Sequence, residues 1–174
     1  MRLLDGKKIV ITGVLTDASL AYGVAQLARA EGADIVLTGA GRALKLTQRT
    51  ARKLGDDIEV FELDVTVPEH GVAVREALTA KWGHVDGVLH AIGFAPEVCL
   101  GDDFLAAQWD DVAIAMHIST YSLKALADAF LPLMGEGGSF VGLDFDNQQA
   151  WPAYNWMGVA KSALQSVSRY LAKE

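Results

Sequence analysis

The chain has 174 residues, 51% of them hydrophobic and 21% charged, so it is long enough to bury a sizeable core and is not expected to be disordered. Fifteen Lys and Arg against 22 Asp and Glu give a formal net charge of −7, which argues against a nucleic-acid partner. Cys99 cannot form an intrachain disulfide and no apolar run reaches membrane-spanning length, so we expect a cytoplasmic protein with no membrane partner.

Short apolar runs bounded by glycine and polar turns recur along the chain, and their composition is typical of doubly buried parallel strands. They cover 8–13, 34–39, 58–65, 85–93 and 138–145. Segments with helical periodicity cover 19–31, 42–54, 69–82, 103–133 and 154–173. This alternation predicts a doubly wound, Rossmann-like parallel sheet in a three-layer α/β/α fold. The chain shows no repeat or linker, which favours one domain over residues 1–174.

The turn after the first predicted strand is built largely from small residues and leads into a helix. Small residues let the backbone and a helix N-terminus approach a pyrophosphate closely. The pattern G-x-G-x-x-G is absent, so an ordinary tight turn with Ser19 as the helix N-cap explains this segment equally well. The candidate cofactor contacts here are Gly13, Val14, Ser19 and Leu20.

Two further predicted strands end in candidate cofactor contacts. Asp64 and Val65 close the third strand, where the carboxylate would accept from an adenine amino group and the Val65 amide would donate to the ring. The alternative is an aspartate that caps a turn. After the fourth strand come Ala91, Ile92 and Gly93, and the glycine would let a ribose or nicotinamide lie against the backbone. Open parallel sheets bind ligands at such carboxyl ends of strands.

The segment 103–133 carries more apolar positions than one buried stripe needs. They are Phe104, Trp109, Val112, Met116, Tyr121, Leu123, Leu126 and Phe130. The acidic pair Asp102 and Asp103 is expected to begin this helix, because carboxylates favour the N-terminal end of the helix dipole. Such a helix either is buried within the subunit or pairs with another subunit.

The most informative stretch of the chain is 145–161. Tyr154 and Lys161 are seven positions apart, so on a helix they lie within about 20° of the same face. An ammonium favours a nearby phenolate and can bond ribose hydroxyls, while a phenol can donate toward a carbonyl oxygen that becomes an oxyanion. Phe145 follows the fifth strand and would pack over a cofactor. A lone tyrosine is usually a packing residue and a lone helical lysine a solvated one, but their joint spacing favours a catalytic pair.

The whole chain resembles the enoyl-acyl-carrier-protein reductases of the divergent short-chain dehydrogenase/reductase type, and most closely their mycobacterial members. The similarity runs through LLDGKKIVITGVLTDASLA, FELDV, DGVLHAIGF, GGSFVGLDFD and PAYNWMGVAKSALQSVSRYLAKE. The last two blocks are specific. Ordinary short-chain dehydrogenases place the lysine four residues after the tyrosine, whereas here that position is Gly158, and Tyr154 and Lys161 match the tyrosine-x6-lysine spacing of the enoyl reductases.

This resemblance implies an oxidoreductase of fatty-acid synthesis that transfers a hydride from a reduced nicotinamide to a trans-2-enoyl thioester of acyl-carrier protein or CoA. Tyr154 would stabilise the enolate, Lys161 would hold the nicotinamide ribose, Phe145 would line the site, and Met157 would lie on the substrate side. The segment 103–133 resembles helices that pair between subunits in this family, which implies a homotetramer. Two alternatives stay open: another NAD(P)-dependent short-chain reductase, and a catalytically silent dinucleotide-binding protein.

The end of the second strand departs from the mycobacterial pattern, in which a large aromatic residue stacks on adenine. This chain has Ala40 there, followed by Gly41 and Arg42, so adenine packing is expected to be weaker. Arg42 would face a 2′-phosphate, and no carboxylate stands there to select a free ribose hydroxyl. A surface arginine that begins a helix is the alternative. The resemblance therefore implies NAD as cofactor, with NADH preferred and NADPH possible.

No metal site is expected, because the four histidines lack metal-binding spacing and Cys99 has no partner cysteine, which makes Cys99 a packing or loop residue. Only five strand candidates are present against the six of a full doubly wound sheet. In the family, residues beyond the lysine-bearing helix supply further strands and cover the acyl chain. We therefore expect the chain to be a C-terminally incomplete part of a longer enzyme, and the alternative is a short protein whose site is closed by oligomerisation.

Overall fold

The computed structural model describes residues 2–174, which form two compact units. Unit 1 extends to Ala91 and includes Leu126–Val141. Unit 2 comprises Ile92–Ala125 and Gly142–Glu174.

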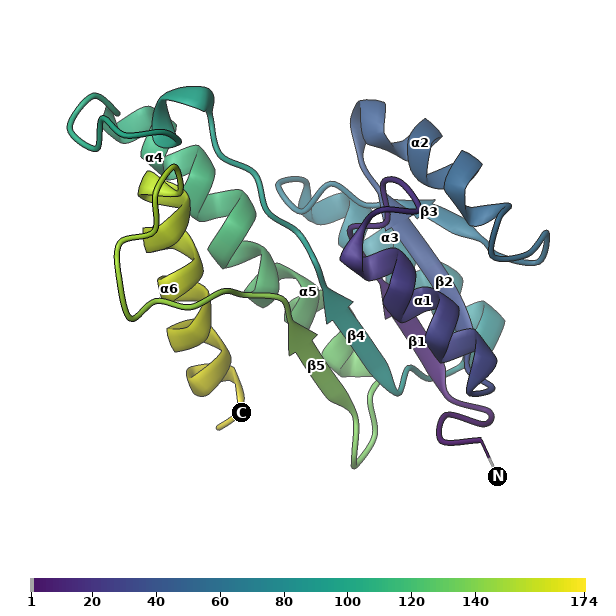
Figure 1. Cartoon of the computed structure of the whole chain (residues 1–174). Coiled ribbons are helices and arrows are strands. Elements are labelled where there is room, and N and C mark those ends of the chain that lie inside the picture. The colour runs from purple at the N-terminus through teal and green to yellow at the C-terminus, as the bar shows by residue number, and fades with distance from the viewer. Residues whose placement is uncertain (1) are drawn as a thin grey trace. The chain divides into compact units, whose positions relative to one another are not determined.

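Unit 1 is built on a five-stranded sheet with the strand order β3-β2-β1-β4-β5 (Figure 1). The strands are β1 (Lys8–Ile11), β2 (Asp34–Gly39), β3 (Val60–Glu62), β4 (Gly87–His90) and β5 (Ser139–Gly142). β1 pairs in parallel with β2 and β4, and β2 pairs in parallel with β3. The central strands are apolar on both faces, so Val10, Ile11, Val36 and Leu37 are fully buried. The predicted doubly wound sheet is confirmed, although every strand but β2 is shorter than its predicted run.

Helices cover both faces of this sheet. They are α1 (Leu20–Ala30), α2 (Gly41–Ala51) and α3 (Pro68–Trp82). In Figure 1, α1 lies in front of the sheet and α3 behind it, which gives unit 1 the predicted three layers. α1 buries only alanines toward the sheet, so helix and strands approach closely. α3 begins with Pro68, which has no backbone N–H that would be left unpaired in the first turn. The helix is capped at its C-terminal end by Gly83, whose φ of 74° is favourable for glycine.

Unit 2 contains α4 (Trp109–Met116) and α6 (Asn155–Leu171), together with a short 3-10 turn at Glu97–Cys99. Its apolar core consists of Ala95, Cys99, Val112 and Ala115, against which Ala107, Met116, Trp156 and Met157 pack. Cys99 is fully buried, and burial raises the pKa of its thiol. The prediction that Cys99 is a packing residue is therefore confirmed.

The single helix predicted over 103–133 is wrong. The structure has α4, then a π-helical turn at His117–Tyr121, then α5 (Ser122–Phe130) and a 3-10 turn at Leu131–Leu133. Asp103 does not begin a helix, because its Oδ1 accepts a hydrogen bond from the Leu105 amide at 3.2 Å and closes a local turn. The dipole argument instead applies to Asp110 and Asp111, which occupy the first turn of α4.

Across residues 2–174, no helix combines the length and the apolar character that crossing a membrane would require.

Candidate active site

The turn after β1 in unit 1 is closely joined to the end of β4. Thr12 Oγ1 donates to the Leu89 carbonyl and accepts from the Ala91 amide, both at 2.9 Å. Gly13 has a φ of 80°, and a Cβ on it would lie 2.0 Å from the Ala91 carbonyl oxygen. Only glycine fits there, so two of the predicted cofactor contacts, Gly13 and Ala91, are adjacent.

The first turn of α1 is available to an anion. Ser19 is the N-cap residue, but its side chain caps nothing, and its Oγ accepts from the amides of Leu15 at 3.2 Å and Thr16 at 3.0 Å. The predicted N-cap position of Ser19 is therefore confirmed, although the preceding loop folds back onto the hydroxyl and no side-chain capping bond forms. No acidic residue lies in this first turn, so its amides and the positive end of the helix dipole suit a phosphate. Val14 is fully buried, and Leu20 is exposed.

At the end of β3, Asp64 takes the role of a turn residue. Its Oδ1 accepts from the Thr66 amide at 2.9 Å and from the Thr66 hydroxyl at 2.6 Å. The structure therefore supports the capping alternative for this oxygen, and Val65 follows in the same turn.

At the end of β2, Ala40 is the N-cap residue of α2. Arg42 is exposed in the first turn of that helix, where no acidic residue accompanies it. This arrangement leaves a guanidinium without a neighbouring carboxylate in the turn after β2.

In unit 2, the structure brings together three of the predicted site residues around a buried ammonium. Lys161 is 9% exposed, and its Nζ donates to the carbonyls of Ile92 at 2.9 Å and Leu143 at 3.1 Å. A Cβ on Gly93 would lie 3.5 Å from Lys161 Cε, so this glycine leaves the side chain room. Burial lowers the pKa of Lys161, and the negative charge of Asp144 partly offsets that effect.

Tyr154 lies at the very start of the helix in which it was predicted. It is the N-cap residue of α6, between Ala153 with a φ of 65° and Asn155 with a φ of 46°. Left-handed conformations of residues other than glycine cost about 1–3 kcal/mol each and persist where the surroundings hold them. The Tyr154 carbonyl still accepts from the Gly158 amide at 3.2 Å, and the one-face arrangement of Tyr154 and Lys161 stays a prediction.

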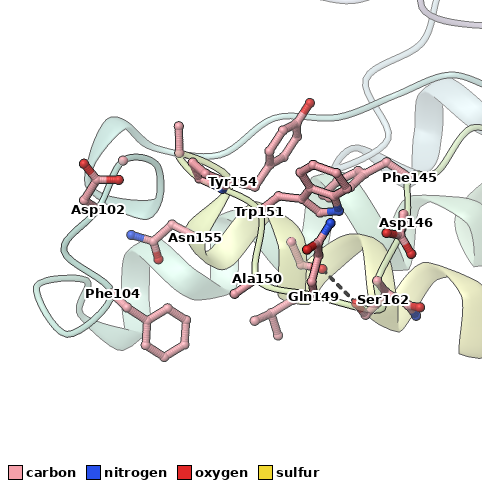
Figure 2. Close-up of a pocket in the computed structure, with 16 residues that line it drawn as sticks. Asp102, Phe104, Phe145, Asp146, Gln149, Ala150, Trp151, Tyr154, Asn155 and Ser162 are labelled. Atoms are coloured by element: carbon pink, nitrogen blue, oxygen red, sulfur yellow. Dashed lines mark hydrogen bonds between the residues drawn. The ribbon is translucent and has the colours of Figure 1, made fainter.

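The ring of Tyr154 packs against Phe145, with the ring centroids 4.2 Å apart. Tyr154 remains 45% exposed. Both rings border a pocket of about 460 Å³ within unit 2. Figure 2 shows Asp102 and Phe104 at one end of this pocket and Phe145 and Asp146 at the other. Trp151, Gly158, Val159 and Ser162 also line the pocket.

Contacts that the sequence analysis missed fix one wall of this pocket. Asn155 Nδ2 donates to the Asp103 carbonyl and Trp156 Nε1 donates to the Phe104 carbonyl, both at 3.2 Å. The rings of Phe104 and Trp156 stack with centroids 4.7 Å apart. The Gly101 amide also donates to the Ala153 carbonyl at 3.0 Å. These contacts hold the loop 101–104 against the residues on either side of Tyr154 and thereby maintain the left-handed backbone there.

Met157 packs against the core of unit 2, and its Cε lies 3.9 Å from where a Cβ on Gly93 would be. Its predicted place on the substrate side stays a prediction.

No group of three or more His, Cys, Asp or Glu side chains that could hold a metal ion occurs in the part of the chain that the structure describes.

Comparisons with known proteins place the chain in one family. A model of the family described as Enoyl-(Acyl carrier protein) reductase matches residues 13–174. The chain is 48% identical to the enoyl-(acyl-carrier-protein) reductase (NADH) of Mycolicibacterium smegmatis, and 45% identical to that of Mycobacterium avium. Each match covers 99% of this chain and 65% of the relative. A Neisseria meningitidis protein of the same description is 38% identical over 99% of this chain and 67% of its own length. The chain thus spans 65% of the length of its two mycobacterial relatives.

Proposed function

Because the chain belongs to the enoyl-(acyl carrier protein) reductase family, we propose that this protein reduces the trans-2 double bond of an enoyl thioester in fatty-acid synthesis. Residues 1–174 would form its dinucleotide-binding domain, and its acyl group would be carried by acyl-carrier protein or CoA. The observation that carries the proposal is the buried Lys161. Its ammonium donates to the Ile92 and Leu143 carbonyls, and Tyr154 of the same unit lines a pocket.

A nicotinamide dinucleotide fits the residues present. When bound, it supplies the hydride for the reaction. In unit 1, the Gly13 turn and the uncapped first turn of α1 suit a pyrophosphate, and Ala40 and Val65 would border the adenosine. In unit 2, Ile92 and Gly93 would accept a ribose or nicotinamide against the backbone.

Lys161 would hold the nicotinamide ribose. A lysine ammonium has three N–H donors, and the two carbonyls take two of them. The third donor remains for a ribose hydroxyl. The carbonyl pair also fixes the direction in which the ammonium points, so little side-chain entropy is lost when the ligand binds.

Tyr154 would donate from its hydroxyl to the thioester carbonyl oxygen, which gains negative charge as the hydride reaches the β-carbon. A donor whose hydrogen bond strengthens as this charge develops stabilises the transition state more than it stabilises the bound substrate. The contact with Phe145 restrains the tyrosine ring. This restraint keeps the hydroxyl in place without the cost of reorganising it during the reaction.

Steady-state assays test this function against its two alternatives. The proposal predicts NADH oxidation that requires crotonyl-CoA or a longer trans-2-enoyl thioester. Another short-chain reductase would oxidise NADH with a 3-oxoacyl thioester or a simple ketone and not with the enoyl thioester. A catalytically silent protein would bind NADH and oxidise it with neither substrate.

We propose that NADH is the preferred cofactor and that NADPH also binds, with Arg42 facing the 2′-phosphate. Arg42→Ala is then expected to weaken NADPH binding by about tenfold, because a charge-assisted hydrogen bond is lost, and to leave NADH binding unchanged. Fluorescence titration with both nucleotides measures this. Lys45→Ala, which removes another exposed cation of α2, is the matched control. An unchanged NADPH affinity in Arg42→Ala would make Arg42 a plain surface residue.

We also propose a homotetramer, supported by large apolar side chains exposed on α4 and on the following π-helical turn. Trp109 is 73% exposed, Tyr121 52% and Ile114 43%. Sedimentation at micromolar concentration is expected to give four times the mass of one subunit, and Ile114→Asp is expected to dissociate the assembly by placing a charge on this face. A wild-type protein that sediments as a monomer, with one 18.6 kDa chain per particle, would refute the assembly.

A further inference from the structure

We propose that Ser119 and Thr120 are positioning residues that hold the backbone on both sides of Lys161, an inference that rests on the cofactor-binding role proposed above for this lysine. Both lie in the π-helical turn His117–Tyr121 of unit 2, and each bonds to a different backbone segment that meets the lysine.

Ser119 holds the loop that carries one of the two carbonyls under the ammonium. It is fully buried, and its Oγ donates to the Phe94 carbonyl at 2.7 Å and accepts from the Phe94 amide at 2.9 Å. One hydroxyl thus satisfies both polar backbone groups of a residue that follows Gly93 directly. The carbonyl of Ile92, two residues earlier, receives the Lys161 Nζ at 2.9 Å. Ser119 therefore acts on the lysine through this short loop.

Thr120 holds the helix that carries the lysine itself. It is 4% exposed, and its Oγ1 donates to the Ala160 carbonyl at 2.6 Å. Ala160 is the residue before Lys161 and is fully buried against this turn. The bond therefore fixes α6 at the position from which the lysine side chain starts.

The π-helical turn explains how two consecutive side chains reach two segments. π turns are rare, cost stability relative to a continuous α-helix, and occur frequently at functional sites. Here the buried hydroxyls of two consecutive residues, Ser119 and Thr120, form hydrogen bonds to backbone groups outside the turn. Because buried polar groups must be paired, each hydroxyl specifies where its partner segment lies. The two segments that approach Lys161 are thereby fixed by one element.

The reactivity of Lys161 tests this inference without any assay of turnover. The full chain is treated with formaldehyde and cyanoborohydride, and dimethylation of Lys161 is followed by peptide mass spectrometry. Thr120→Val keeps the side-chain shape and removes the hydroxyl, and it is expected to raise the labelling rate of Lys161 by about tenfold, as does Ser119→Ala. Thr120→Ser retains the hydroxyl and is expected to label like the wild type.

Ser122→Ala is the matched control, because it removes an equally buried hydroxyl whose bond goes to the Ile118 carbonyl of the same helical segment. Its labelling rate is expected to stay at the wild-type value. Acceleration in Ser122→Ala equal to that in Thr120→Val would mean general loosening and would overturn the proposal. An unchanged rate in both Thr120→Val and Ser119→Ala would overturn it as well.

NADH titration of the same variants separates this inference from the proposed function. Both Thr120→Val and Ser119→Ala are expected to weaken NADH binding about tenfold, with Thr120→Ser and Ser122→Ala unchanged. A wild-type protein that binds no NADH would refute the proposed function, while the labelling rates would still decide whether the two hydroxyls hold Lys161. Normal NADH binding with unchanged labelling would refute the positioning role alone.

Discussion

Replacing Lys161 by methionine is expected to weaken NADH binding on the order of 10²-fold, because methionine keeps most of the apolar stem and loses the ammonium that would bond the ribose. The ammonium is held on two carbonyls, and methionine has no donor with which to bond them or the ribose. Lys161→Ala is expected to have the same effect on the cofactor. The measurement is the Kd for NADH, obtained by fluorescence titration of the purified variants.

The same substitution is expected to reduce stability, because the Ile92 and Leu143 carbonyls lose their shared donor. A buried polar group left unpaired costs about 1–3 kcal/mol. Thermal unfolding must therefore be recorded beside the titration, to show that the variant is folded at the assay temperature. Lys173→Ala removes an exposed lysine just after α6 and should leave the Kd unchanged. A folded Lys161→Met with wild-type NADH affinity would remove the role assigned to the lysine.

Tyr154→Phe is expected to lower kcat by about 10²–10³-fold and to leave the Kd for NADH unchanged. The phenol donates to an oxygen that carries charge only during the reaction, so its loss acts on the transition state and not on the bound cofactor. The phenylalanine ring can keep the contact with Phe145, which limits the structural effect of the change. Steady-state kinetics with an enoyl thioester and NADH titration give the two quantities.

Tyr170→Phe provides the control for this experiment, because it removes a phenol from a residue of α6 that is 70% exposed. Its kcat should equal that of the wild type. A kcat for Tyr154→Phe within a few-fold of the wild type would show that the hydroxyl is not the donor to the developing oxyanion.

Much of the fold follows from patterns that are local in the sequence. Apolar runs bounded by glycines predicted all five strands, and their alternation with helices predicted a parallel sheet. The errors come from backbone conformations that periodicity does not report. Apolar spacing continues across the π-helical turn at His117–Tyr121 and across the loop before α4, so the pattern indicated one helix. Left-handed Ala153 and Asn155 likewise place Tyr154 ahead of α6.

The residues of the candidate site that belong to one sequence motif could be predicted. Contacts between segments that are far apart in the sequence could not. The spacing of Tyr154 and Lys161 singled out both residues, although Tyr154 is the N-cap residue of α6 and not its first helical residue. The bonds from Ser119 to Phe94 and from Thr120 to Ala160 join residues 25 and 40 positions apart. A serine or threonine within an apolar helical segment gives no local signal for such partners. Only the fold brings these groups together.

Isotope transfer tests the proposed reaction most directly. NADH that carries deuterium at C4 of the nicotinamide is supplied with a trans-2-enoyl thioester, and the acyl product is analysed by mass spectrometry. The proposed reaction predicts a saturated acyl thioester with the deuterium on its β-carbon, formed by the wild type and strongly reduced in Tyr154→Phe. An acyl group recovered unreduced and without deuterium from an enzyme shown to bind NADH would contradict it.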